Sequence, residues 1–522
     1  MKYIVLIILI MYWLFLLYTT VGAEECKWEN EIPCTTIMLL PNTNDTSNKI
    51  SPSYTITQKD IKKYNLKDIN SVLTFVNGAS IVQSGPTGQQ SSLFLRGTNS
   101  NHTLVLLNGV PINDYSTPTG AFDFGQIFMS NISHVEVYKG SMASHLGADS
   151  IGGAVNLRTF VDFENDISVN SNGINGSYTT SHNDWYMNVK GGIFESEEVS
   201  ALEGASEKDG TKNKSFNTNI YKWINNNLKF RTTLFARNTL TDIDGHNVAI
   251  QDGFSDNNMY AFQTGFDYIT RTSKNYLTFH THEYNRDYDT NDYRSNTHFI
   301  RGEHKTKYYG IGFDYKHDES ISKHEDNLGL FSNIHYKNLS LHGRKDEEHE
   351  SYKIGFMFDF IRLSHSTGFK RATQWTPIEE SRLDEISFDY KDLTLSLFEN
   401  EVNSYTQDGL ELSYNINDLQ VFGSYINSKQ NGKTQLRRPE WSGGLKYDWN
   451  NILIDYTYLG ESDDIHNTNW STIKQKEKHL LNLGYDYNGF TIGVTNLLDE
   501  NYAPHGFNSP GKKINFGWHK KF

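Results

Sequence analysis

Apolar and polar side chains alternate along most of this chain, from about residue 159 to residue 522. Near the end, the segments LNLGYDY and FTIGV flank Asn488-Gly489. An Asn-Gly pair between alternating segments is a strong signal for a two-residue β-hairpin turn. The same pattern surrounds Asn450-Asn451 and Asn417-Asp418. We therefore predict that this region is an antiparallel sheet.

Periodicity alone does not separate a soluble β-sandwich from a membrane barrel, but other features favour the barrel. No long apolar run follows residue 23, and the chain contains 31 Tyr and 30 Phe, enough for aromatic girdles. The last segment, 514–522, alternates Phe516, Trp518 and Phe522, although Lys520 interrupts its apolar face. About 22 strands of roughly 10 residues fit this length if the loops are short. We predict a membrane all-β fold with a 22-stranded antiparallel transmembrane β-barrel at residues 159–522.

The first 23 residues resemble a secretory signal peptide. Lys2 precedes an uncharged apolar run, and Val21-Gly22-Ala23 supplies small residues for cleavage. An uncleaved membrane anchor is the alternative, because the run approaches spanning length. In the tail at residues 24–49, Cys26 and Cys34 would form one local disulfide in an oxidising compartment or remain two thiols.

Residues 50–158 follow a different pattern, which predicts a compact α/β domain. Leu66, Ile69, Val72, Leu73 and Val76 recur at helical spacing. Further expected elements are a helix at 57–63 and short strands at 92–95, 103–107 and 134–138, separated by Gly-rich turns. A barrel of about 22 strands is an open pore unless something fills it. This N-terminal domain is the expected plug.

Several motifs carry a family resemblance that covers both regions in order. They are GQQSSLFLRGTN at 88–99, HTLVLLNGVPIN at 102–113, ISHVEVYKG at 132–140, LGADSIGGAVNL at 146–157, LRRPEWSG at 436–443 and VTNLLDENY at 494–502. Together they closely resemble the TonB-dependent outer-membrane transporters, and among them the cobalamin transporters. The resemblance implies a multi-pass barrel in the bacterial cell outer membrane that acts as a monomer among outer-membrane lipids.

Members of this family import a scarce, bulky nutrient with force from the TonB-ExbB-ExbD complex. The partner pairs with an N-terminal strand called the TonB box. The segment that resembles it here is Thr35, Thr36, Ile37, Met38, Leu39, Leu40 and Pro41, without the family's usual leading Asp. A corrinoid such as cobalamin is the expected ligand, with a ferric siderophore or haem as the alternative. A passive porin or an adhesin is a further alternative from another class.

The resemblance also assigns roles to plug residues. Those expected to contact substrate are Ser84, Gly85, Thr87, Gln89, Asn113, Asp114, Tyr115, Ser116 and Thr117. Those expected to form a charged latch between plug and wall are Arg96, Glu136 and Lys139. Polar turns and a solvated strand face are the simpler interpretations of the two groups.

The remaining chemistry-bearing residues give weaker signals. Carboxylates that resemble a calcium site in the outer loops are Asp242, Asp244, Asp252 and Asp256, although solvated loop acids are commoner and no cofactor is required. A haem or metal role is conceivable for His280, His282, His298 and His304. The net charge of −14 argues against a nucleic-acid partner. We find no Gly-x-Ser-x-Gly, His-Glu-x-x-His or P-loop motif and predict no enzyme.

Overall fold

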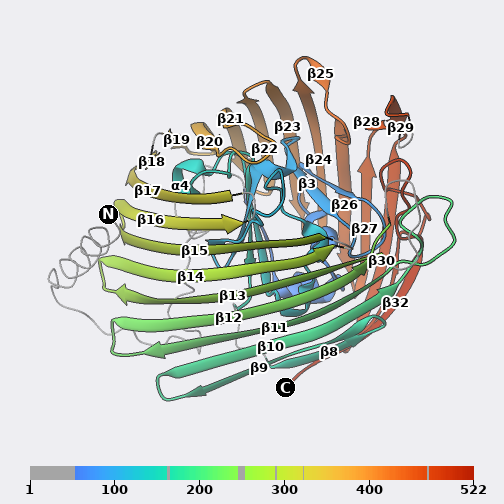
Figure 1. Cartoon of the computed structure of the whole chain (residues 1–522), viewed down its shortest axis with the longest axis horizontal. Coiled ribbons are helices and arrows are strands. Elements are labelled where there is room, and N and C mark those ends of the chain that lie inside the picture. Colours follow the sequence, from blue (N-terminus) through green and yellow to red (C-terminus); the bar gives the residue numbers. More distant parts are fainter. Residues whose placement is uncertain are drawn as a thin grey trace.

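The structure is a computed structural model that describes residues 53–160, 165–244, 253–288, 291–320, 323–347, 349–466 and 469–522. A small mixed domain lies within the ring formed by long antiparallel strands (Figure 1). Within these described residues, no helix is long and apolar enough to cross a membrane.

The inner domain has three short helices, three 3-10 turns and seven strands. In chain order they are β1 (Ser53–Ile56), α2 (Gln58–Lys63), α3 (Ile69–Leu73), β2 (Ala79–Gln83), β3 (Ser91–Leu95), η2 (Ser100–His102), β4 (Thr103–Leu107), β5 (Val110–Pro111), η3 (Phe124–Gln126), η4 (Met129–Asn131), β6 (His134–Lys139), α4 (Ala143–Leu146) and β7 (Gly153–Arg158). One sheet has the order β1-β6-β7-β4-β5, with β4 and β7 parallel, and β2 pairs with β3.

The wall is built from long antiparallel strands. They are β8 (Asp166–Asn170), β9 (Gly173–His182), β10 (Trp185–Glu197), β11 (Gly210–Trp223), β12 (Leu228–Asp242), β13 (Phe254–Ile269), β14 (Ser273–Tyr288), β15 (Asn291–Thr306), β16 (Tyr309–Ser320), β17 (Lys323–Tyr336), β18 (Leu339–Asp346), β19 (His349–Phe358), β20 (Ile361–Lys370), β21 (Glu379–Tyr390), β22 (Leu393–Val402), β23 (Tyr405–Ile416), β24 (Leu419–Gln430), β26 (Trp441–Trp449), β27 (Ile452–Leu459), β30 (Lys478–Tyr487), β31 (Phe490–Thr495) and β32 (Lys513–Lys521). Three short strands, β25 (Lys433–Thr434), β28 (Ser462–Ile465) and β29 (Thr472–Gln475), lie in the connections.

The ring closes because β32 pairs with β8. The two-residue β25 pairs only with the end of β24, and β24 pairs directly with β26. Without β25, 22 strands of the described chain form the closed wall. The predicted fold class, a 22-stranded antiparallel barrel plugged by an N-terminal α/β domain, is confirmed.

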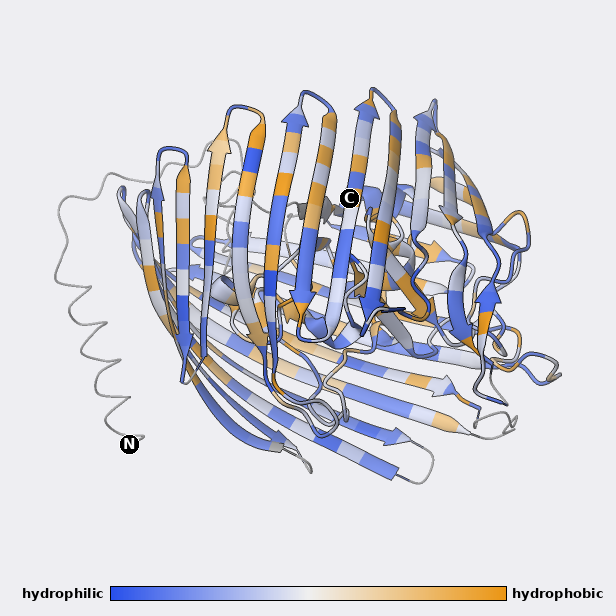
Figure 2. Cartoon of the chain, turned by 90° about the horizontal axis from the view of Figure 1, so that it is seen from above, coloured by the Kyte–Doolittle hydropathy of each residue, from blue (hydrophilic) through white to orange (hydrophobic). Residues whose placement is uncertain are grey.

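The outer face of the wall is apolar and exposed, as a lipid-facing surface requires. Hydrophobic and hydrophilic positions alternate along the strands in Figure 2. On β19, Ile354 is 44% exposed and Phe358 is 63% exposed. Ser351 and Lys353, on the other face of the same strand, are buried. Because successive side chains of a strand point to opposite faces, one face meets lipid and the other meets the plug.

Tight hairpins connect the strands at one end of the barrel. Asn488 and Gly489 have φ of 50° and 85°, and Asn450 and Asn451 have φ of 47° and 71°. Positive φ at both central residues defines the type I′ turn, which suits the twist of the flanking strands. The hairpins predicted from the alternation therefore form where the sequence places them.

The plug has its own hydrophobic core, which extends to the wall. Ile69, Val72 and Leu73 of α3 are fully buried in a cluster that also contains Phe235 and Tyr284 of the wall. Helix α3 is shorter than the predicted helix at 66–76. Asp68 caps it by accepting a hydrogen bond from the Ser71 amide, so that the helix begins only at Ile69.

Candidate transport site

The two ends of the barrel differ in their connections, and this difference orients it. Phe522 N donates to Asn165 O (3.0 Å), so the C-terminus lies where the plug enters the wall, at the end that carries the tight hairpins. The opposite end has longer connections, including residues 198–209 and 496–512. Outer-membrane barrels have short periplasmic turns and longer external loops. We call the end with the longer connections the outer rim.

Both plug segments expected to contact substrate lie at the outer rim. The Thr87 amide donates to Glu198 Oε2 (3.1 Å), just beyond the end of β10, and Gln89 Nε2 donates to Asp242 O (2.6 Å) at the end of β12. In the second segment, Asp114 Oδ1 accepts from Ser295 Oγ (2.9 Å) near the start of β15.

Most of these residues are packed against the wall rather than open to solvent. The buried ones are Gly85, Gln89, Asn113, Asp114, Tyr115 and Ser116. The partly exposed ones are Ser84, Thr87 and Thr117. The second group is therefore the more accessible one at the outer rim.

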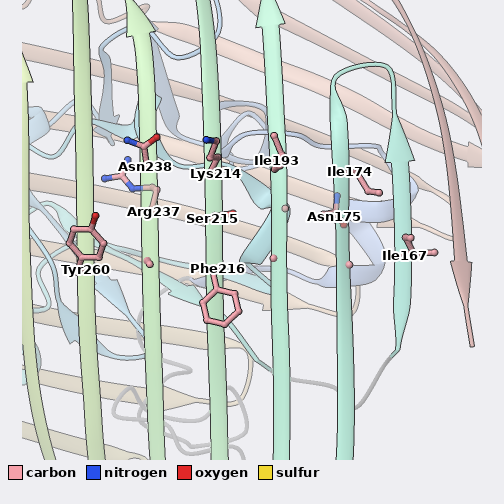
Figure 3. Close-up of a pocket in the computed structure, with 14 residues that line it drawn as sticks. Ile167, Ile174, Asn175, Ile193, Lys214, Ser215, Phe216, Arg237, Asn238 and Tyr260 are labelled. Atoms are coloured by element: carbon pink, nitrogen blue, oxygen red, sulfur yellow. The ribbon is translucent and has the colours of Figure 1, made fainter.

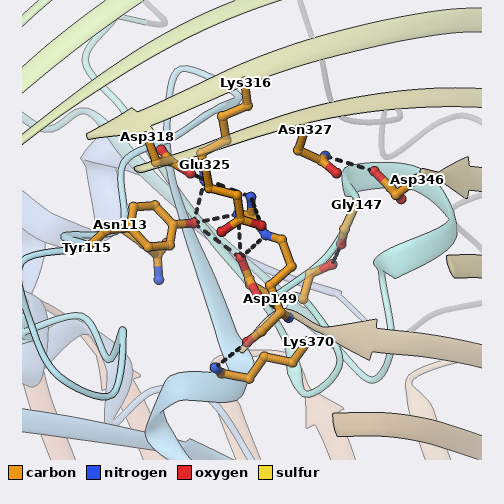
Figure 4. A network of polar contacts seen from close by, with 12 residues as sticks. Asn113, Tyr115, Gly147, Asp149, Lys316, Asp318, Glu325, Asn327, Asp346 and Lys370 are labelled. Atoms are coloured by element: carbon orange, nitrogen blue, oxygen red, sulfur yellow. Dashed lines mark hydrogen bonds and ion pairs between the residues drawn. The ribbon is translucent and has the colours of Figure 1, made fainter. Parts of the chain in front are cut away.

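Tyr115 is the centre of a buried polar network that joins the plug to the wall (Figure 4). Its hydroxyl donates to Asp149 Oδ2 (3.2 Å) and accepts from Arg371 Nη2 (3.1 Å). Lys316 of β16 contacts the same hydroxyl and pairs with Asp318 (2.9 Å). Burial raises the pKa of Tyr115 well above its usual value, and the charge of Asp149 adds to this effect. The phenol is therefore neutral and acts as a hydrogen-bonding hub.

The wall residues of this network were not anticipated from the sequence. Asp149 falls within the plug motif at 146–157, but Lys316, Asp318 and Arg371 belong to the region of simple alternation. Their signal is only that each charged residue occupies, or lies next to, an inward-facing position of a strand.

A second buried network joins Arg96 and Lys139 of the plug to the wall strands β21 and β23. Arg96 Nη2 lies 2.7 Å from Glu385 Oε1 on β21 and 2.9 Å from Glu411 Oε2 on β23. Lys139 Nζ lies 2.6 Å from the same oxygen of Glu411. Burial alone would lower the pKa of Arg96, but the carboxylates of Glu385 and Glu411 raise it above its usual value. Burial lowers the pKa of Lys139, against the charge of Glu411.

Glu136, the third residue expected in the latch, forms its contacts within the plug. Its carboxylate pairs with Arg158 (3.1 Å) and accepts from Asn156 Nδ2 (2.8 Å) on the neighbouring strand β7. The structure thus brings Arg96 and Lys139 together on the wall and places Glu136 in a separate pair at the exit of the plug.

Two further contacts fix the plug near Arg96. His102 Nε2 lies 2.9 Å from Glu379 Oε2 of β21, and burial lowers the pKa of His102 in spite of this carboxylate. Arg438, from the barrel motif at 436–443, donates to Gly97 O (2.8 Å) and stacks over the ring of Phe94. These wall contacts restrain the segment between β3 and β4.

The described residues that were expected to bind calcium each have a different partner. Asp242 Oδ2 accepts from the Gly210 amide (2.9 Å), and Asp256 Oδ1 on β13 accepts from Asn238 (2.6 Å). Asp244 faces Asp209, whose pKa burial raises to about 6 with a contribution from Asp244. Asp252 lies outside the described residues. Among those described, no group of three or more His, Cys, Asp or Glu is arranged to hold a metal ion.

The four histidines considered for haem or metal do not converge. His280 and His282 are buried neighbours on β14, with Nε2 of the first 3.1 Å from Nδ1 of the second. His298 contacts Thr281, and His304 contacts Asn275. The proposed signal peptide, the Cys26-Cys34 pair and the TonB box at 35–41 all lie outside the described residues.

Comparison with known proteins agrees with this architecture. Residues 45–154 match the family described as "TonB-dependent Receptor Plug Domain". The siderophore receptor PirA from Acinetobacter baumannii has 14% identity and a TM-score of 0.73, covering 92% of this chain and 100% of that one. A mutant ferric enterobactin receptor (PfeA) from Pseudomonas aeruginosa has 13% identity and a TM-score of 0.73, with the same coverage.

A third solved structure, P. aeruginosa FpvA bound to heterologous pyoverdines, has 12% identity and a TM-score of 0.71, covering 91% of this chain and 86% of that one. At such identities the likeness of the whole chains establishes the fold. The plug match adds the family of the inner domain. The chain therefore has the architecture of the TonB-dependent receptors, with a plug domain enclosed in a 22-stranded barrel.

Proposed function

We propose that this protein imports a bulky metal chelate across the outer membrane with force supplied by the TonB-ExbB-ExbD complex. The observation that carries the proposal is the position of the plug, inside a closed barrel and joined to its wall by buried ion pairs. Such a plug excludes free diffusion of large solutes. Import through this barrel then requires that the plug move or partly unfold.

The charged contacts make that movement costly without an external force. Separating a buried ion pair leaves charges without partners and costs about 3–5 kcal/mol when one partner is removed. Arg96, Lys139 and Glu411 share one such network, and Tyr115, Asp149 and Arg371 share another. Thermal motion alone will rarely break both, so energy transmitted through the N-terminal tail is the reasonable source.

The TonB box at 35–41 gives a direct test of this coupling. Deleting these seven residues should leave ligand binding intact and abolish uptake, because the deletion removes the strand that the partner pairs with. Deletion of residues 27–33, also seven residues of the tail, is the control and should leave both properties unchanged. Uptake that persists without residues 35–41 would contradict the proposal.

The ligand class rests on two separate grounds. The plug motifs resemble those of cobalamin transporters, which favours a corrinoid. The solved structures named above are described as receptors for siderophores or as complexes with them, which favours a ferric siderophore. Both ligands are metal chelates that are too large for passive diffusion through small pores.

A binding panel decides between them. Purified protein in detergent would be titrated with cyanocobalamin, ferric enterobactin, ferric pyoverdine and haem. We expect submicromolar affinity for one class only, and a Tyr115→Phe variant that loses the hub hydroxyl should bind that class more weakly. No retention of any of these chelates, combined with steady ion conductance, would favour a passive pore instead.

A further inference from the structure

A row of small residues crosses the lipid-facing side of the wall. Gly176 of β9 lies opposite Gly191 of β10, which lies opposite Phe216 of β11; Phe216 lies opposite Ala236 of β12, and Ala236 opposite Tyr260 of β13. Three of these five positions carry no side chain beyond a methyl group. The exposed residues around them are large, among them Ile174 and Ile193. The wall is therefore hollowed at Gly176, Gly191 and Ala236, beside the rings of Phe216 and Tyr260.

The hollow is a groove of about 620 Å³ lined by residues of β8 to β13. Figure 3 shows Phe216 and Tyr260 beside it, with Ile193, Ile174 and Ile167 on the neighbouring strands. The lining is almost entirely apolar along the row itself. Its volume and apolar lining suit a flexible hydrocarbon chain.

The groove lies at the outer edge of the apolar band. Tyr260 is 51% exposed and stands where an aromatic girdle residue is expected. One row nearer the outer rim, Lys214 lies opposite Asn238, which lies opposite Asn258, so the surface over β11 to β13 is polar there, while Ile193 and Ile174 continue the row on β10 and β9. The boundary between acyl chains and headgroups therefore crosses the outer edge of the groove.

Lys214 is placed to bind an external anion. On the same connection and strand, Lys208 pairs with Glu197 (3.6 Å) and Lys212 pairs with Glu195 (3.1 Å). Lys214 is exposed at the groove's edge and forms no ion pair with any residue in the described part of the chain. Its charge is thus available to a partner outside the protein.

We propose that the groove binds one acyl chain of an outer-leaflet lipid with a net negative headgroup, whose phosphate pairs with Lys214. Bulk lipid is as apolar as the groove, so selectivity must come from packing and charge. The small residues supply close packing for the chain, and Lys214 supplies the charge. The inference does not depend on which nutrient the barrel imports.

Native mass spectrometry of the full-length protein provides the test. The protein would be equilibrated in micelles containing equal amounts of phosphatidylglycerol, a net anion, and phosphatidylcholine, whose phosphate is balanced by its own choline cation, with identical chains. We expect one retained lipid, with about a fivefold preference for phosphatidylglycerol, as one basic residue near a membrane surface provides. Equal retention of the two lipids would overturn the proposal.

Variants separate the two parts of the site. Lys214→Gln should abolish the headgroup preference, whereas Lys212→Gln, on the same strand and face, should keep it. Ala236→Leu should reduce retention of both lipids because it fills the groove at a position that already carries a Cβ, and Val189→Leu, on the outward face of β10, is its control. Ala236→Val repeats the test with less added volume.

Folding of every variant would be checked by heat-modifiable mobility. A lipid preference that is retained in properly folded Lys214→Gln would exclude the assigned role of Lys214.

Discussion

At the scale of single residues, buried ion pairs join the plug to the wall of the barrel. Glu411 accepts from both Arg96 and Lys139, and each of the three side chains is almost completely buried. Buried charges persist only when they are paired and hydrogen-bonded. The network therefore holds the plug in one position, and losing any member should loosen it.

Glu411→Gln is the sharpest test of this network. The variant leaves Arg96 and Lys139 with a neutral partner, so we expect the plug to lose about 3 kcal/mol of local stability. Native-state hydrogen exchange of the amides of β3 and β6 should accelerate accordingly. Glu399→Gln, at an exposed position on the neighbouring strand β22, should leave that exchange unchanged.

His134 predicts a pH dependence of the plug. Burial, together with the charge of Arg158, lowers the pKa of His134 to about 4. Between that value and about 6.5, the unfolded chain binds more protons than the folded one, so stability rises with pH in this window and is lost as the pH falls through it. The full effect is about 3 kcal/mol.

Hydrogen exchange of β6 and β7, corrected for intrinsic rates, would be followed from pH 7 to pH 4.5. We expect progressive loss of protection in the wild type and a flatter profile in His134→Gln. The exposed His182→Gln serves as the control. Identical profiles for His134→Gln and the wild type would remove His134 as the cause.

The sequence identified Tyr115, the centre of the buried polar network, but not the wall residues Lys316 and Arg371 that contact it. Tyr115 closely follows the plug motif at 102–113, and the resemblance placed it in an outward-facing loop. Lys316 and Arg371 lie about two hundred and two hundred and fifty residues further along the chain, on strands whose pattern specifies only an inward or outward direction. Which inward residue meets Tyr115 depends on barrel stagger, which alternation does not encode.

At the scale of elements, local signals set the short helices of the plug. Thr57 and Asp60 form a reciprocal capping box at the start of α2, with Asp60 N to Thr57 Oγ1 at 3.3 Å and Thr57 N to Asp60 Oδ2 at 2.9 Å. This pair satisfies amides that a six-residue helix cannot satisfy internally. Helix α2 follows directly from the edge strand β1.

Thr57→Ala should therefore unfold α2 locally at a cost of about 1 kcal/mol. The amides of residues 58–66 should exchange faster, while those of β4 and β7 keep their protection. Lys59→Ala, at an exposed position of the same helix, should have little effect. A Thr57→Ala variant with unchanged exchange would show that tertiary packing alone holds the helix.

Element positions were more predictable for the wall than for the plug. The hairpins at Asn450-Asn451 and Asn488-Gly489 have positive φ at both turn residues, and the turn pair and the flanking alternation are both local signals. In the plug, the apolar spacing over 66–76 reflects a buried face that continues into the turn after α3. Spacing alone therefore overestimated the length of that helix.

At the scale of the whole molecule, two domains with different sequence patterns form one closed assembly. The alternation of the wall predicted its class, because only a closed barrel leaves no unpaired edge in lipid, and the length of the region fitted about 22 strands. The tilt, the closure between β32 and β8 and the contacts of the plug arise from interactions across hundreds of residues. Those features were accessible only through the family resemblance or the structure.

The central claim, that the plug must move for import, can be tested by locking it. Ser130 Oγ of η4 and Ser215 Oγ of β11 lie 2.6 Å apart across the boundary between plug and wall. The Ser130→Cys and Ser215→Cys pair would be introduced into a chain whose Cys26 and Cys34 are replaced by Ser. Each single substitution serves as a control for the loss of its hydroxyl.

Uptake of the chelate selected by the binding panel would be measured in cells before and after reduction of the engineered disulfide. We expect the oxidised protein to bind the chelate normally and import none, and we expect reduction to restore import. Import at the wild-type rate with the disulfide fully formed would show that the plug need not leave this part of the wall, which contradicts the account.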